Sequence, residues 1–140
     1  MNTVTLLAHF PKMTFRRLQN LTTAFESLEH AWTARYAEYH ARIRWPDALI
    51  CEFLAWRAAT NPDAIQEALS RKQIYAISIH EPAYPRLLRE IYDPPICLFV
   101  RGELRQYPYP IAMVGSRKCS TYGTYMTETL ARVLAVSGVT

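Results

Sequence analysis

The sequence predicts a protein in two parts, a small helical bundle followed by the start of an α/β domain. Apolar residues recur every three or four positions through residues 1–72, and short β-forming runs replace this pattern afterwards. Of the 140 residues, 50% are hydrophobic and 20% are charged, which excludes a disordered tail. The longest uninterrupted apolar run, Ile96 to Val100, is far shorter than a membrane-spanning helix requires.

Start signals mark four helices in the first part. Thr14 can cap a first helix, and Ser27 can cap a second whose apolar face runs to Tyr39. Pro46 suits the first turn of a third helix, and Asn61 can cap a fourth. Because the connections are only a few residues long, these helices should form a compact bundle with the aromatic residues in its core.

Short extended runs organise the second part, residues 73–140. Residues 74–77 and 96–100 read as strands, and the prolines between them exclude a long regular element. Residues 111–114 form a wholly apolar run, typical of a strand buried on both faces. Ser120 or Thr121 can cap a following helix, which Gly138 ends.

The junction between that apolar run and the helix is the candidate site. Gly115 allows backbone N–H groups to approach an anion, and the helix N-terminus adds free donors and a positive dipole end. Arg117 is a forked donor suited to phosphate oxygens. With Ser116, Lys118 and a capping hydroxyl, the loop predicts a phosphate cradle. A tight turn that leaves Arg117 in solvent is the alternative.

Charge and motif content narrow the function. Residues 1–70 carry seven basic and seven acidic side chains, whereas residues 71–140 carry nine and five, so the net charge of +4 belongs to the second half. This asymmetry indicates an anionic partner such as nucleic acid or phosphate. The chain has no dinucleotide fingerprint, P-loop or nucleophile elbow, so we expect no cofactor and no catalytic residue.

The three cysteines indicate the compartment. Cys51, Cys97 and Cys119 are far apart, and no pair has zinc-ligand spacing. The first residues also lack the features of a secretory signal. We therefore expect no metal site, no membrane association and a location in the reducing cytoplasm.

Three stretches in the second part carry a family resemblance. They are Tyr84-Pro85-Arg86-Leu87-Leu88 with Asp93-Pro94-Pro95, then Leu98-Phe99-Val100-Arg101-Gly102, and Val114-Gly115-Ser116-Arg117 with Tyr122-Gly123. In this order and spacing they resemble the DprA/Smf family of bacterial DNA-processing proteins. The resemblance covers residues 74–140, and the helical part is similar only in outline to the family's sterile-alpha-motif-like (SAM-like) or helix-hairpin-helix-like N-terminal domain.

The resemblance implies both a fold and a function. The second part would be the start of a Rossmann-like domain, in which Gly115, Ser116 and Arg117 hold a DNA phosphate and Ser120 stands where the family usually has threonine. Such proteins bind single-stranded DNA and help load the RecA recombinase during natural transformation, without catalytic turnover. Full-length members are homodimers.

Length suggests that the second domain is incomplete. Residues 111–140 provide about one strand–helix unit, whereas a doubly wound sheet needs several. We therefore expect the chain to be an N-terminal piece, with the dimer surface beyond Thr140. Two alternatives stay open at this point: a fragment of a nucleotide-binding or nucleotide-hydrolysing Rossmann-like enzyme, and a helical protein-interaction module.

Overall fold

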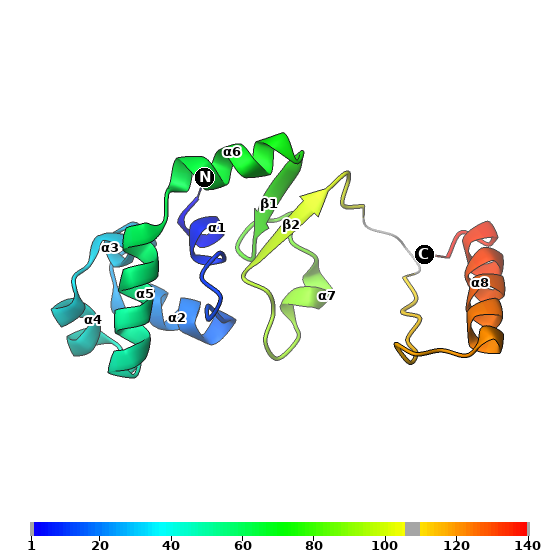
Figure 1. Ribbon diagram of the computed structural model, residues 1–140, viewed down its shortest axis with the longest axis horizontal. Coiled ribbons are helices and arrows are strands. Elements are labelled where there is room, and N and C mark those ends of the chain that lie inside the picture. Colours follow the sequence, from blue (N-terminus) through cyan, green and yellow to red (C-terminus); the bar gives the residue numbers. More distant parts are fainter. Residues whose placement is uncertain (1, 106–109, 140) are drawn as a thin grey trace. The chain divides into compact units, whose positions relative to one another are not determined.

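The computed structural model describes residues 2–105 and 110–139, and Figure 1 shows the order of its elements. The chain divides into two compact units, Met1–Glu103 and Leu104–Thr140, which are described separately. Within the described residues, no helix combines the length and the apolar character needed to cross a membrane.

Six helices precede the sheet in the first unit. They are α1 (Thr3–Leu7), α2 (Phe15–Ala24), α3 (Leu28–Thr33), α4 (Tyr36–Arg42), α5 (Asp47–Ala59) and α6 (Pro62–Arg71). The predicted starts of α2, α3 and α6 are confirmed, because the side chains of Thr14, Ser27 and Asn61 accept hydrogen bonds from first-turn N–H groups. Pro46 directly precedes α5 and occupies its cap position rather than its first turn.

Two features of the bundle differ from the prediction. Helix α1 was not expected, and its short, largely buried sequence is capped by Asn2, which accepts the Thr5 N–H at 2.8 Å. The predicted single helix from Leu28 to Tyr39 is two helices, since the backbone is extended at Ala34 and Arg35. Neither glycine nor proline marks this break in the sequence.

A tertiary contact on one side and a local capping contact on the other accompany the break between α3 and α4. The Arg57 guanidinium of α5 donates to the carbonyl oxygens of Trp32 and Ala34 at 2.5 and 2.9 Å. On the other side of the break, the Glu38 carboxylate accepts the Arg35 N–H at 2.9 Å. These bonds satisfy backbone groups that a continuous helix would have paired internally.

The core of the first unit is aromatic. Phe53 is fully buried and lies 5.2 to 5.9 Å, between ring centroids, from the rings of Phe10, Tyr39, Trp45 and Trp56. The Tyr39 hydroxyl donates to the Ala31 carbonyl at 2.5 Å, and burial raises the pKa of Tyr39 to about 12. Most of the helical aromatics therefore lie in the core, as their spacing predicted, whereas Tyr36 is 39% exposed.

The first unit also contains the sheet. Strand β1 (Ile74–Ser78) pairs antiparallel with β2 (Cys97–Arg101), with Ile74 opposite Arg101 and Ser78 opposite Cys97. Between them lies α7 (Arg86–Arg89), a single turn. The β1 strand contacts α1 and α6, so the hairpin joins the hydrophobic core of the helices.

The coarse expectation of a helical part and a mixed α/β part agrees with these elements. The sheet of the described residues is two-stranded and antiparallel, so a Rossmann-like arrangement is not seen in it, and the SAM-like detail also stays a prediction. The predicted domain boundary at residues 72 and 73 stays a prediction as well, whereas the first compact unit continues to Glu103.

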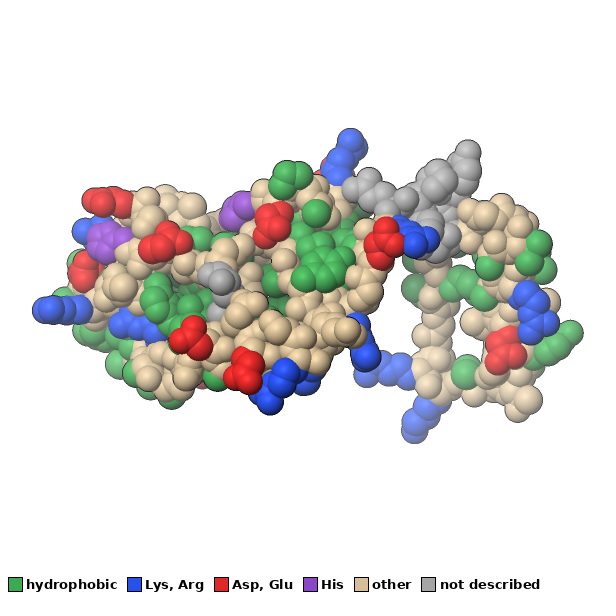
Figure 2. Space-filling model, turned by 90° about the horizontal axis from the view of Figure 1, so that it is seen from above, with side chains coloured by type: hydrophobic (Ala, Val, Ile, Leu, Met, Phe, Trp, Pro, Cys, Tyr) green, Lys and Arg blue, Asp and Glu red, His purple; other side chains and the backbone are tan. Residues whose placement is uncertain are grey.

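In the described part of the second unit, residues 110–120 form no regular element and lead into α8 (Thr121–Val136). Residues 111–114, predicted as a buried strand, are exposed and form no strand, since they have no ladder partner among the described residues. The α8 helix ends as predicted, with Gly138 at a φ of +75°. Hydrophobic side chains stand on its surface (Figure 2), including Tyr122, Tyr125, Val133 and Val136.

Candidate nucleic-acid interface

The predicted site lies where residues 110–120 lead into α8. Ser120 is the helix cap, and its Oγ accepts the Gly123 N–H at 3.1 Å. The Thr124 N–H donates to the Ser120 carbonyl oxygen at 3.0 Å. These two bonds leave the first N–H groups, those of Thr121 and Tyr122, without an intrahelical acceptor. The positive end of a 16-residue helix therefore opens onto the loop.

Ser116 folds the loop onto itself. Its Oγ accepts the Lys118 N–H at 3.2 Å and donates to the Lys118 carbonyl oxygen at 3.0 Å. A Cβ atom added at Gly115 would have no neighbour within 4 Å, so the glycine is not required here by packing against the described residues. The loop shape therefore comes from serine hydrogen bonds, which are local in sequence.

An open cavity of about 720 Å³ brings most of the predicted residues together. Gly115, Ser116, Lys118 and Ser120 line it. Arg117 does not line it, although it is exposed and adjacent in sequence. The structure thus groups four of the five predicted residues. The Arg117 side chain is in solvent, as the tight-turn alternative predicted.

Cys119 also lines the cavity, together with three polar residues that sequence reasoning did not single out: Thr124, Thr127 and Glu128. Helical spacing could have identified these three. Counting from the Ser120 cap, positions 124, 127 and 128 follow the four-, seven- and eight-residue intervals that place side chains on one face. The Thr124 hydroxyl lies 3.3 Å from the Cys119 Sγ, which holds this thiol against the first turn of α8.

This arrangement suits an anion at the loop end of the cavity. Two free N–H groups, the helix dipole and two exposed cationic side chains favour a phosphate there. Glu128 lies on the same wall, one turn beyond Thr124, and would repel an anion that entered more deeply. The geometry therefore favours binding a phosphate at the entrance.

The other two motif stretches lie in the first unit, one in the β1–β2 connection and the other largely in β2. Tyr84 is buried, its hydroxyl donates to the Pro95 carbonyl at 2.7 Å, and burial raises its pKa. The Arg89 guanidinium lies over the Tyr84 ring, 5.6 Å from its centroid. The Asp93 carboxylate accepts the Phe15 N–H of α2 at 3.3 Å. These residues tie the β1–β2 connection to itself and to the bundle.

Comparison with known proteins identifies relatives. Residues 75–140 match the family described as DNA recombination-mediator protein A. The chain is similar to Protein Smf of Synechocystis sp., with 31% identity over 128 residues that cover 88% of this chain. It is also similar to DNA processing protein DprA of Streptococcus pneumoniae, with 44% identity over 54 residues, or 38% of this chain.

The chain aligns with only part of each relative's length. The matched region spans 32% of the Synechocystis protein and 19% of the pneumococcal protein. No solved structure matches the chain.

Proposed function

The chain belongs to the DprA/Smf family of DNA recombination-mediator proteins, and from this premise we propose that it binds single-stranded DNA through the loop at residues 115–120. The observation that carries the proposal is the position of this loop. It lies inside the matched region and at the open N-terminus of α8. A helix N-terminus beside exposed cations is a recurrent phosphate-binding arrangement.

Binding would proceed through the backbone of the DNA strand rather than its bases. The N–H groups of Thr121 and Tyr122 donate to phosphate oxygens, and Gly115 leaves room for the sugar because no side chain occupies that position. Arg117 and Lys118 are exposed and form no ion pair with the described residues, so their charges are available to the strand. Because phosphate contacts carry no base information, sequence preference should be weak.

We further propose that the bound strand is passed to RecA, as the family resemblance implies, in the cytoplasm during natural transformation. In this role the protein is a binding partner and carries out no catalytic turnover. The recombination-mediator role of the matching family and the DNA-processing role that names the pneumococcal relative support the general role. A RecA filament-assembly assay on single strands, with and without this protein, tests the transfer step.

The binding step is tested by a salt titration of the full chain with an oligothymidylate. Arg117→Ala should weaken binding and flatten the log–log salt slope by about 0.7, the contribution of one phosphate contact. Arg132→Ala is the matched control, since Arg132 is an exposed arginine of α8 outside the cavity. Equal affinities and slopes for the two variants would reject the assignment of Arg117.

A further inference from the structure

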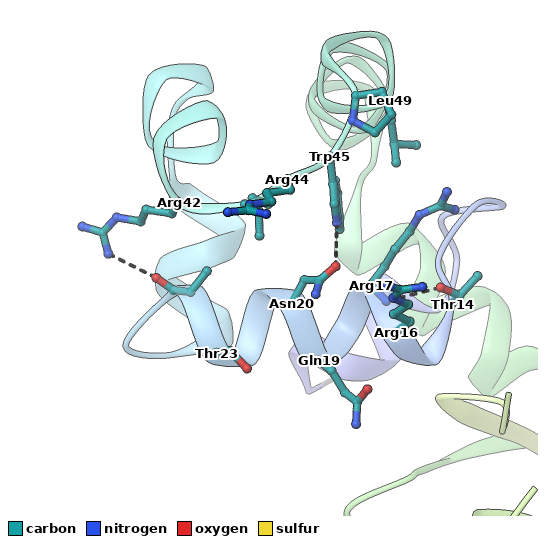
Figure 3. A pocket seen from close by; sticks show the side chains of 13 residues that line it. Thr14, Arg16, Arg17, Gln19, Asn20, Thr23, Arg42, Arg44, Trp45 and Leu49 are labelled. Carbon is teal, nitrogen blue, oxygen red and sulfur yellow. Dashed lines mark hydrogen bonds between the residues drawn. The ribbon is translucent and has the colours of Figure 1, made fainter. Parts of the chain in front are cut away.

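The first unit has a second basic cavity, here named the arginine cleft. It lies between α2 and the connection from α4 to α5, with a volume of about 660 Å³ (Figure 3). Its lining residues are Thr14, Arg16, Arg17, Gln19, Asn20, Thr23, Ala24, Arg42, Ile43, Arg44, Trp45, Pro46 and Leu49. Four of them are arginines and none is acidic, so the cleft concentrates positive charge.

The four guanidinium groups are held in two different ways. Arg17 donates to the Lys12 carbonyl, and Arg42 donates to the Ala24 carbonyl at 3.4 Å while lying 5.5 Å from the Phe25 ring centroid. Arg16 and Arg44 are exposed and make no side-chain hydrogen bond or ion pair with the described residues. Two arginines are therefore fixed by the fold, and two have all their donors available to a ligand.

The walls of the cleft are joined by a specific contact. The indole N–H of Trp45, a buried residue, donates to the Asn20 side-chain oxygen of α2 at 3.3 Å (Figure 3). Ile43 and Leu49, on the same wall as Trp45, are also buried in the core. The arginines thus stand on a rigid base, which limits the entropy lost when they bind.

An adjoining cavity adds an aromatic surface. It measures about 480 Å³ and shares Thr14, Arg16 and Gln19 with the arginine cleft. Tyr92 lines it and is 100% exposed. Asp93 also lines it, but its carboxylate accepts the Phe15 N–H and so is engaged by the backbone of α2. A fully exposed tyrosine in a cavity shared with the free Arg16, next to a cleft that also holds Arg44, combines stacking surface with charge as single-strand binding sites do.

We propose that the arginine cleft binds the phosphodiester backbone of a single nucleic-acid strand, and that Tyr92 stacks on one of its bases. The arginines provide bidentate donors for successive phosphates, and the tyrosine favours an unpaired strand over an acidic polypeptide, which has no base to stack. The inference does not rest on the loop at residues 115–120, because every residue that carries it belongs to the first unit.

The test compares charge-removing variants of the full chain. The probe is a labelled oligothymidylate of about 16 nucleotides, titrated over a range of salt concentrations. Arg16→Ala with Arg44→Ala should weaken binding about tenfold and flatten the salt slope by about 1.4, for two lost phosphate contacts. Arg71→Ala with Lys72→Ala removes the same charge at the end of α6, outside the cleft, and is the control.

The Arg117→Ala variant separates this site from the proposed function. A loss in the Arg16/Arg44 variant that persists when Arg117→Ala is also present supports an independent cleft. If the Arg16/Arg44 variant binds as the Arg71/Lys72 control does while Arg117→Ala weakens binding, the cleft proposal is overturned and the loop proposal stands. Unchanged circular dichroism and melting temperature confirm that the exposed substitutions leave the fold intact.

The nature of the ligand has its own tests. Tyr92→Ala should weaken oligothymidylate binding at least fivefold, whereas Tyr92→Phe should retain it, because the ring rather than the hydroxyl stacks. Poly-glutamate or inorganic phosphate that competes as well as the oligonucleotide at equal charge would overturn the proposal in favour of a general anion site. Tighter binding of a duplex of the same length would overturn the single-strand preference.

Discussion

The two units of the chain differ in what holds their side chains in place. In Met1–Glu103, helices and hairpin share one aromatic and aliphatic core, with Phe53, Tyr39 and Ile50 at or near zero exposure. In the second unit none of the described residues is buried. The first unit is therefore stabilised by burial, at roughly 25 cal/mol per Å² of apolar surface, and the described part of the second by local hydrogen bonds. We propose one anion site in each unit, and each is held in the way that its unit is stabilised.

The comparison shows two routes to a cationic site. The loop at residues 115–120 is shaped by Ser116 and Ser120, whose bonds span two or three residues. The arginine cleft instead requires α2 to pack near the α4–α5 connection, 25 residues apart at the Trp45–Asn20 bond. Mutations in the core should therefore remove the cleft and leave the loop unchanged.

The largest expected effect comes from the centre of the core. Phe53→Ala should lower the free energy of unfolding of the first unit by about 3–5 kcal/mol, because it removes a fully buried ring and leaves a cavity. Val133→Ala on the exposed side of α8 should change stability by less than about 0.5 kcal/mol. Urea denaturation followed by tryptophan fluorescence measures the first effect, since all three tryptophans lie in the first unit, and NMR chemical shifts of α8 in the same titration measure the second. Equal losses of stability in Phe53→Ala and Val133→Ala would contradict the contrast between the two units.

A smaller loss of folding stability is expected when the contact at the break between α3 and α4 is removed. Arg57→Ala should cost about 2 kcal/mol, since two carbonyl oxygens lose a charged donor. Arg57→Lys should recover only part of this, because one ammonium cannot reproduce the planar fork. Thermal melts compare these variants with Arg71→Ala, which replaces an exposed arginine at the end of α6 and is the control. A neutral Arg57→Ala would show that the break does not depend on this contact.

The cap of α8 tests the locally determined unit. Ser120→Ala should destabilise the helix by about 1 kcal/mol, with a loss of helical signal at residues 121–124 in NMR chemical shifts. Ser120→Asp should retain the helix, since a carboxylate accepts the same N–H. Ser137→Ala at the other end controls for loss of a hydroxyl. Intact shifts in Ser120→Ala would mean that the cap does not define the loop.

The smallest effect concerns acid sensitivity in the bundle. The hydrogen bond from the Arg35 N–H, followed by one to His30, lowers the pKa of Glu38 below its ordinary value of 4.5. A lowered folded-state pKa stabilises the fold above that ordinary value, and the contribution is lost as the pH falls through the lowered one. Glu38→Gln should therefore lose less stability on acidification than the unchanged chain. Glu26→Gln removes an exposed carboxylate outside these contacts and is the control. Its loss of stability on acidification should equal that of the unchanged chain.

Much of the bundle could be predicted because its signals are local. Thr14, Ser27 and Asn61 cap the helices that their spacing predicted, and Ser120 was one of two candidates for the cap of α8. Ser120 could be predicted as a cap because a hydroxyl three residues before an N–H needs no distant partner. Gly115 and Arg117 were predicted as the end of a buried strand, and the described residues 111–114 do not form that strand. Charge counting failed for the cleft, because seven basic and seven acidic residues cancel over residues 1–70 although four of the arginines gather in space.

The sequence by itself determined the starts of α2, α3 and α6, the positions of the two strands and the capping hydroxyl of α8, because each depends on groups a few residues apart. Only the tertiary structure decided the break at Ala34 and Arg35, the absence of a strand at residues 111–114 and the gathering of the arginines. Each of these depends on a partner distant in the chain: the Arg57 guanidinium, a neighbouring strand, or the packing of α2 near the α4–α5 connection. Periodicity along one segment carries no information about which distant segment will satisfy its backbone or surround its charges.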